Sequence, residues 1–148
     1  MAIVRSAGTE IIRSAHFEDV NNTAEKIILG KQHHIYTVLS IIFYCTAQNG
    51  TEPGYCLLKG YDSNAGTTDQ NIYITRTDCS ANQVFVWNDK FSFNGFEPTD
   101  FAGPMDSDAK QDAIADQGSS VAQYLQFSTD GASTYYDVTV TFIDQNNE

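Results

Sequence analysis

The sequence predicts an all-β protein, an antiparallel β-sandwich or jelly-roll-like single domain with one short helix in a long loop and an extended N-terminal arm. Three observations favour this class. Apolar and polar residues alternate over residues 133–143, β-branched and aromatic residues dominate the apolar runs, and Gly, Asn, Asp and Pro separate those runs. A chain of 148 residues can bury enough surface for one domain without disulfides or metals.

We expect residues 1–26 to form an N-terminal arm or edge strands, and residues 27–148 to form the sandwich domain. The first segment contains two short apolar pairs, Ile3-Val4 and Ile11-Ile12, each followed by an arginine. Neither pair is long enough to form a stable element alone. The segment must therefore be held either by its own sandwich or by a neighbouring chain.

The longest apolar stretch, residues 35–45, is apolar on both faces of a strand. Ile35, Ile41 and Phe43 share one face in this interpretation, with Tyr36 and Val38 on the other. This pattern predicts a central strand that is covered on both sides. A buried helix is the alternative, but the β-branched and aromatic residues favour the strand. The stretch is too short to cross a bilayer as a helix.

Shorter strands are expected between turn signals, at residues 55–61, 71–77, 83–87, 91–93 and 121–128. Within residues 71–77, Ile72 and Ile74 should point inward. Asn88-Asp89 lies between two of these strands and predicts a tight hairpin turn. The total of six or seven strands, with this spacing, is typical of a sandwich or jelly roll.

Residues 94–119 interrupt the strand pattern with Pro, Gly and then an acidic run. A Ser or Asp that can serve as N-cap, acidic residues near the start and Gly118 beyond the end predict one short helix within this segment. Asp106, Asp108 and Asp112 suggest a calcium site, but the glycine and glutamate positions of an EF-hand loop are absent. We interpret them as a helix cap followed by a solvated acidic face, without a metal.

Residues 133–143 are the best-defined strand of the sequence. Tyr136, Val138, Val140 and Phe142 fall on one face, and mostly polar residues fall on the other. The apolar face requires earlier strands to cover it. After this strand we expect only a polar tail, residues 144–148.

The net charge of −11 comes from eight Lys and Arg against nineteen Asp and Glu. This balance argues against non-specific binding to nucleic acid or to an anionic membrane. Residues 97–148 hold most of the excess, with one basic and ten acidic side chains. We interpret the excess as a solvated face that keeps the protein in solution.

No residue pattern indicates catalysis or a cofactor. Cys45, Cys56 and Cys79 fit no zinc motif, and their odd number favours a reducing compartment. His33 and His34 would point to opposite sides of a strand, so we expect surface residues rather than metal ligands. Nucleophile, phosphate-loop and metalloprotease motifs are absent, which predicts no enzyme activity, no catalytic residues and no cofactor. The first residues lack the apolar core of a signal peptide, which predicts synthesis in the cytoplasm.

Four pieces of the chain resemble a family of small β-sandwich virion proteins of tailed bacteriophages. They are residues 35–38, the loop 62–70, residues 85–91 and the terminal strand 137–142. The insertion at residues 96–118 and the N-terminal arm depart from that pattern. The resemblance implies a structural protein on the virion capsid surface, a capsid decoration (cement) protein that binds the shell as a homotrimer. Its partners would be the major capsid protein or other virion proteins, with no nucleic acid and no membrane.

Two other functions remain open: a neck, tail or fibre-base component of the virion, and a carbohydrate-binding sandwich module. The module would need an exposed aromatic residue such as Trp87 or Tyr61. For the virion function, the candidate partner-binding residues are Ile3, Val4, Ile11, Ile12, Trp87, Phe96, Phe101 and Met105. The alternative is that these apolar residues complete the core of the monomer.

Overall fold

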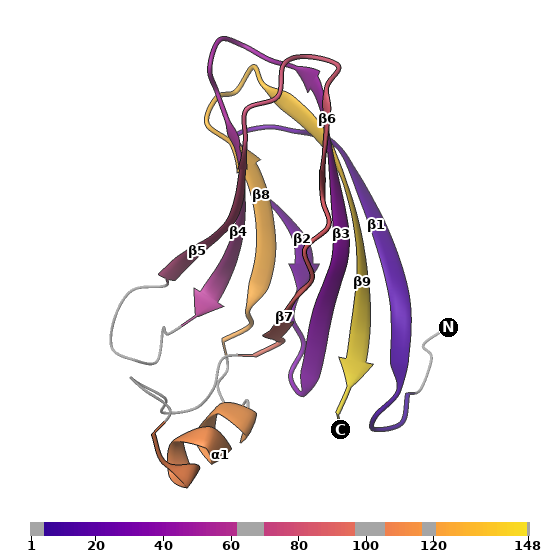
Figure 1. Cartoon of the computed structure of the whole chain (residues 1–148), viewed down its shortest axis with the longest axis vertical. Helices are drawn as coiled ribbons and strands as arrows, with labels where there is room; N and C mark the ends of the chain where they lie inside the picture. The colour runs from indigo at the N-terminus through magenta and orange to yellow at the C-terminus, as the bar shows by residue number, and fades with distance from the viewer. Residues whose placement is uncertain (1–4, 62–69, 97–105, 117–120, 148) are drawn as a thin grey trace.

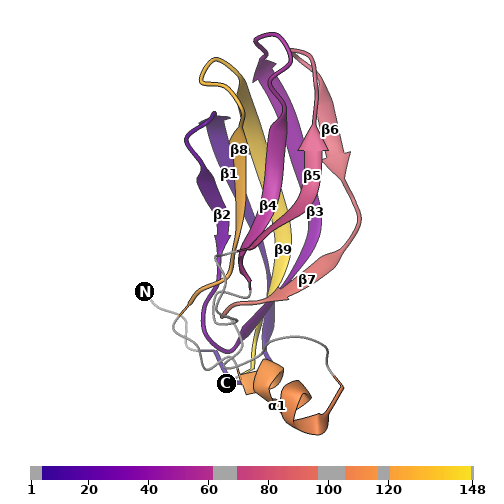
Figure 2. The same cartoon turned by 90° about the vertical axis from the view of Figure 1, so that its left-hand side faces the viewer.

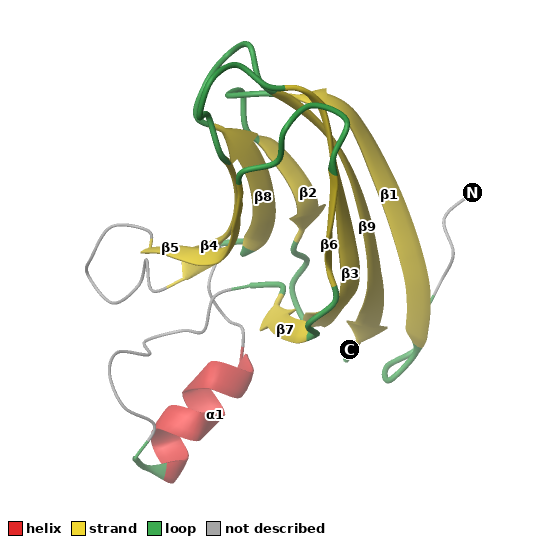
Figure 3. Cartoon of the chain, turned by 45° about the horizontal axis from the view of Figure 1, so that its top comes forward, coloured by secondary structure: helices red, strands yellow, loops and turns green. Residues whose placement is uncertain are grey.

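The computed structural model describes residues 5–61, 70–96, 106–116 and 121–147, which form two antiparallel sheets packed face to face (Figure 1). The strands are β1 (Glu10–Val20), β2 (Glu25–Leu29), β3 (His34–Ala47), β4 (Gly54–Tyr61), β5 (Gln70–Thr77), β6 (Val84–Trp87), β7 (Phe91–Asn94), β8 (Tyr124–Thr129) and β9 (Tyr135–Asn146). The helix α1 (Asp108–Asp116) lies beyond one end of the sandwich (Figure 3). The predicted all-β sandwich with one short helix is confirmed, although the described residues contain nine strands instead of six or seven.

The strand order is that of a jelly roll. Sheet A has the order β1-β9-β3-β6, with β7 also paired to β3, and sheet B has the order β2-β8-β4-β5. If β6 and β7 count as one interrupted strand, eight strands form four antiparallel pairs, as in a jelly roll. The edge strands β1 and β2 lie along one side of the sandwich, and β5 and β6 along the other (Figure 2).

The core lies between the inward faces of the two sheets. As predicted, Tyr136, Val138, Val140 and Phe142 on β9 are all buried. Phe127 of β8 in sheet B meets them, with its ring 5.4 Å from that of Tyr136 in an edge-to-face arrangement. The period-two pattern of β9 therefore identified the face that holds the two sheets together.

β3 is central in its sheet, but the prediction that both its faces are covered was wrong. A β-bulge lies between Val38 and Ser40, where the register to β9 shifts. The bulge changes which side chains point inward: Tyr36 and Val38 are buried before it, and Ile41 and Phe43 after it. The strand therefore looks apolar on both faces in the sequence, whereas its outward side chains, such as Ile42, remain accessible to solvent.

β6 and β7 do not form the hairpin that was predicted at Asn88-Asp89. Both pair antiparallel with β3, β7 against residues 35–38 and β6 against residues 41–44. They run in the same direction as one edge strand, interrupted opposite the bulge of β3. The prediction failed because β3, with 14 residues, is long enough to pair with both segments in succession.

The N-terminal segment contributes an edge strand to each sheet. β1 pairs with β9 at the edge of sheet A, and β2 pairs with β8 at the edge of sheet B. Val20, at the end of β1, belongs to the core, and the expected boundary at residue 26 falls within β2. Deleting residues 1–26 would therefore remove core residues together with any contact surface.

Three backbone segments cross closely at the end of the sandwich near α1. The Gly30 N–H donates to the Gln123 carbonyl, and the Gln123 N–H donates to the Gly95 carbonyl, both at 2.9 Å. A Cβ atom on Gly30 would collide with the Gly95 and Gln123 carbonyl oxygens, and one on Gly95 would collide with the Lys31 carbonyl. Glycine is needed at both positions because the backbones approach too closely for a side chain.

The predicted short helix is present as α1, and Ser107 is its N-cap. The Lys110 N–H donates to the Ser107 hydroxyl oxygen at 3.4 Å, and the Lys110 ammonium pairs with the Asp106 carboxylate at 2.7 Å. Asp108 and Asp112 are exposed. Within the described ranges, no group of three or more His, Cys, Asp or Glu residues is placed to hold a metal ion.

Two buried tyrosines make the stability of the sandwich sensitive to alkaline pH. Burial raises the pKa of Tyr36 and of Tyr136 to about 12, and the nearby Asp144 carboxylate adds to the effect at Tyr36. An unfolded chain loses these protons near a pH of about 10. Since the folded state holds the protons longer, we expect the free energy of unfolding to fall as the pH rises from about 10 to about 12.

Urea unfolding between pH 8 and pH 12 measures this loss. The Tyr36→Phe variant keeps the ring and lacks the ionisable hydroxyl, so its stability should fall less steeply over the same interval. If the free energy of unfolding falls equally steeply with pH in the variant and in the natural protein, Tyr36 does not contribute to the alkaline loss of stability.

Candidate functional site

The outer face of sheet A carries three rows of side chains without a carboxylate, ammonium or guanidinium group. Cross-strand partners in register share a face, so the pairing defines the rows. They are His16, Thr139, Ile42 and Val86; Ser14, Thr141 and Ser40; and Ile12, Ile143, Thr37 and Ser92. We call these eleven residues the uncharged face. Its lack of Asp, Glu, Lys and Arg contrasts with the net charge of −11 of the whole chain.

Polar groups on the uncharged face are bonded to one another across strands. The hydroxyl oxygens of Ser14 and Thr141 lie 3.1 Å apart, and the His16 Nδ1 atom lies 2.7 Å from the Thr139 hydroxyl oxygen. These pairs hold the side chains in place on the pleated surface. The face therefore offers a firm surface on which many hydrogen-bonding groups already have partners.

Two of the four apolar residues of this face lie on its edge strands. Ile12 on β1 is 71% exposed, and Val86 on β6 is 43% exposed. Val86 lies opposite Ile42, and the neighbouring Val84 lies opposite Tyr44. Exposed β-branched side chains on an edge strand are typical of surfaces that contact another protein.

The predicted partner-binding residues do not form one surface. Ile12 is on the uncharged face, whereas Ile11 is half-buried on the opposite side of β1. Trp87 is half-buried and packs against the core, which agrees with the alternative that it completes the core of the monomer. Phe96 forms an isolated bridge with Ala122 beyond the end of β7. The other four, Ile3, Val4, Phe101 and Met105, lie outside the described residues.

A second feature, a cluster of ionisable side chains around Asp144, lies near the end of β9. Asp144 is only 1% exposed. Its carboxylate lies 2.6 Å from His34 Nδ1, 3.0 Å from an Arg5 terminal nitrogen and 3.4 Å from Arg13 Nε. Arg5 also donates to the main-chain carbonyls of Thr9 and Asp144, which holds residues 5–9 against the end of β9.

This cluster corrects two predictions from the sequence. The polar tail does not begin at Asp144, because β9 continues to Asn146 and Asp144 occupies the next inward position after Phe142. His34 is not a surface residue, since its ring is largely buried against Asp144. Both residues were assigned to the surface because polar side chains usually lie there. At this site the ion pairs of Asp144 with Arg5 and Arg13 offset the cost of burying polar side chains.

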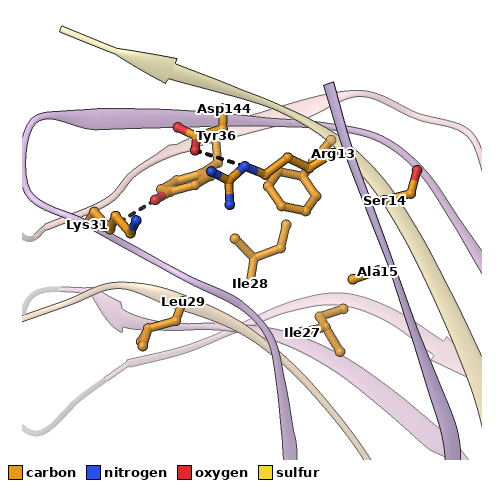
Figure 4. Close-up of a pocket in the computed structure, with 10 residues that line it drawn as sticks. Arg13, Ser14, Ala15, Ile27, Ile28, Leu29, Lys31, Tyr36 and Asp144 are labelled. Carbon is orange, nitrogen blue, oxygen red and sulfur yellow. Dashed lines mark hydrogen bonds and ion pairs between the residues drawn. The ribbon is translucent and has the colours of Figure 1, made fainter. Parts of the chain in front are cut away.

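A groove of about 220 Å³ opens between β1 and β2, beside the Asp144 cluster (Figure 4). Its apolar wall comes mainly from Ile27, Ile28, Leu29 and Phe142. Its polar side comes from Arg13, Ser14, Lys31, Tyr36 and Asp144. The groove combines an apolar wall with two cationic side chains.

Both cations of the groove have unused hydrogen-bond donors. The Arg13 side chain is 45% exposed, and its Nε atom pairs with the Asp144 carboxylate. No described residue forms a hydrogen bond with its two terminal nitrogens. In Figure 4 the Arg13 guanidinium lies above Ile28 and beside the Tyr36 ring. Within the described chain, the Lys31 ammonium also has no acidic partner, while the Lys31 N–H donates to the Tyr36 hydroxyl oxygen at 3.1 Å. The groove can therefore accept an anion.

The sequence contained one signal for this groove that the prediction did not use. Arg13 occupies an inward position of β1, in step with the half-buried Ala15 and Phe17. A charged residue in an inward position requires a partner of opposite charge. That partner, Asp144, is far away in sequence, so only the fold reveals the pair.

Burial raises the pKa of all three cysteine thiols, and a second hollow lies beside one of them. Cys45 and Cys56 are buried as expected, and burial raises the pKa of both thiols, which keeps them in the unreactive protonated form. The second hollow lies around Cys79 and the ion pair between Arg76 and Asp78. That pair has a nitrogen–oxygen distance of 2.6 Å, so its charges already neutralise each other.

Comparisons with known proteins do not identify a family for this chain. No protein-family model matches the chain, and no curated protein matches it. One similar solved structure is described by the words "Bacillus endospore appendages form a novel family of disulfide-linked pili". It has 9% sequence identity and a TM-score of 0.42, over 100% of this chain and 97% of that chain. Among the described elements, no helix has the length and apolarity to cross a membrane.

Proposed function

We propose that this chain is a structural virion protein of a tailed bacteriophage, a capsid decoration protein that binds the outer shell through the uncharged face. The observation that carries the proposal is the contrast between this face and the rest of the molecule. Three adjacent rows across sheet A have no Asp, Glu, Lys or Arg, although the chain has a net charge of −11. Charged side chains on a surface that stays in water cost no desolvation energy. Charged side chains on a surface that is buried on assembly must be desolvated, so a surface without them binds a partner more favourably.

The fold and its edges agree with this role. Jelly rolls are common in viral capsid domains and in lectins, which is an analogy at the level of fold. The exposed edge formed by β6 and β7 is interrupted, and β1 is distorted by a bulge near Asp19, which has a φ of 52°. Such irregular edges hinder open-ended strand pairing, so a protein of this kind can stay in solution until its binding surface is available.

A sugar-binding module is less well supported by the positions of the aromatic residues. The module would need Trp87 or Tyr61 as an exposed platform. Trp87 packs against the core, and the side chain of Tyr61 lies outside the described residues. Apart from His16, the uncharged face contributes Ile, Val, Ser and Thr side chains, which cannot stack on a sugar ring.

The Val86→Lys variant tests the binding face. A lysine at this position would place an ammonium group at the β6 edge of the buried contact. We expect at least about a tenfold loss of affinity for the shell, because burying an unpaired charge costs more than about 1.4 kcal/mol. Co-sedimentation with shells assembled from the major capsid protein of the same phage measures the loss.

Ile72→Lys is the matched control. Ile72 lies opposite the core residue Leu58, on the inward-facing side of β5 as predicted, but the free edge of sheet B leaves it 38% exposed, close to Val86 at 43%. The control variant should sediment with shells like the natural protein. The proposal fails if the natural protein does not sediment with shells, or if Val86→Lys and Ile72→Lys behave alike.

A further inference from the structure

We propose that the groove between β1 and β2 binds the acidic segment Asp106–Asp116 of a second copy of this chain, with Arg13 and Lys31 holding its carboxylates. This inference rests on the assembly role proposed above and adds the contact between neighbouring copies. The groove shares only Ser14 with the uncharged face. The two contacts can therefore be tested separately.

The groove supplies the receiving half of the contact. Its two cations have unused donors, and a guanidinium group with two free terminal nitrogens can bind a carboxylate with two parallel hydrogen bonds. The apolar wall next to them lowers the local dielectric constant and strengthens the attraction. A volume of about 220 Å³ accommodates a side chain such as aspartate with part of its backbone.

The segment around α1 supplies the other half. Asp108 and Asp112 are one helical turn apart, exposed and without an ion pair in the described chain. Asp106 differs, because it pairs with Lys110. The helix projects beyond the end of the sandwich in Figures 1 and 3, so its carboxylates are accessible to another molecule.

The uneven distribution of charge favours a second copy as the occupant. Arg13 and Lys31 belong to the first 36 residues, which hold four of the eight basic side chains, whereas residues 97–148 hold ten of the nineteen acidic ones. Two copies with a net charge of −11 repel each other in most orientations. Pairing the groove of one with α1 of the other brings opposite charges together.

The contact is heterologous, because it joins different surfaces of the two copies. The groove lies at the side of the sandwich formed by the edges β1 and β2, while α1 lies beyond its end (Figure 1). Heterologous contacts close into a ring when the rotation between copies permits it. A ring on a shell lattice would present every copy of the uncharged face in an equivalent way.

Two variants that each remove one half of the contact test the proposal by complementation. Arg13→Gln weakens the groove, and the double change Asp108→Asn and Asp112→Asn weakens the acidic segment. We expect the full-length natural protein to self-associate at low salt, and each variant alone to associate at least about tenfold more weakly. An equal mixture of the two variants should form dimers, because one copy retains the groove and the other retains the segment.

Sedimentation velocity at several protein concentrations provides the measurement. The association should weaken between about 0.1 M and 1 M salt, where the screening length falls from about 10 Å to about 3 Å. Lys31→Gln provides a second groove variant in case Arg13→Gln disturbs the Asp144 cluster. Lys90→Gln and Asp89→Asn, which change exposed charges between β6 and β7, are the matched controls and should associate like the natural protein.

Three results would overturn the inference: a natural protein that stays monomeric at low salt, groove variants that associate normally, or a mixture that recovers no dimer. None of them affects shell binding through Val86. Conversely, a protein that self-associates through the groove but ignores capsid shells would retain this contact and refute the proposed virion function.

Discussion

Replacing Asp144 by alanine is expected to lower the free energy of unfolding by about 3–5 kcal/mol, the usual cost of removing one partner from a buried ion pair. Asp144 is the shared partner of Arg5, Arg13 and His34. Without its carboxylate, the Arg5 guanidinium would remain largely buried without a counter-charge. Residues 5–9 would also lose part of their attachment to β9.

Asp137→Ala is the control for this loss. Asp137 lies on the same strand, but its side chain is on the outer face of sheet A and accepts a hydrogen bond from the Asp19 N–H at 3.0 Å. A solvent-exposed bond of this kind contributes about 1 kcal/mol or less. Urea unfolding followed by the fluorescence of Trp87 compares the two variants. A loss below about 1 kcal/mol for Asp144→Ala would show that the buried charges are not held by this carboxylate.

The Gly95→Ala variant is expected to lose about 3 kcal/mol, the upper part of the range for added volume in a packed interior. The new methyl group would overlap the Lys31 carbonyl oxygen, which belongs to the backbone and cannot rotate away. Relief requires a shift of the chain, which would strain the bond from the Gly95 N–H to the His34 carbonyl at 2.8 Å. The hydrogen bonds between the backbone segments at Gly30, Gly95 and Gln123 would weaken.

Gly50→Ala separates this collision from the effect of adding a Cβ to an unusual backbone conformation. Gly50 has a φ of 66°, and a Cβ at that position would have no neighbour within 4 Å. Its replacement should cost about 1 kcal/mol, the penalty for an alanine in the left-handed region. Thermal unfolding of both variants measures the difference. Equal losses would show that steric contact at Gly95 is unimportant.

The candidate sites could be predicted only in part, for reasons that particular residues make clear. Ile12 was named as a contact candidate because it belongs to a short apolar pair in the N-terminal segment, a pattern that is visible in the sequence. The cross-strand rows were not, because Thr139 and Ile42 become neighbours only through the register of β9 and β3. The groove was missed for the same reason, since its walls come from β1, β2, β3 and β9.

The sequence by itself determined the all-β class, the inward face of β9 and the capped helix α1. These features depend on local alternation, propensity and capping, which act between residues close together in the chain. Only the tertiary structure decided that β6 and β7 both pair with β3, one after the other. It also decided that the bulge between Val38 and Ser40 leaves Ile42 outward, and that Asp144 is buried among arginines. Those outcomes depend on strand pairing and on ion pairs between residues distant in sequence. These interactions form only when the sheets assemble.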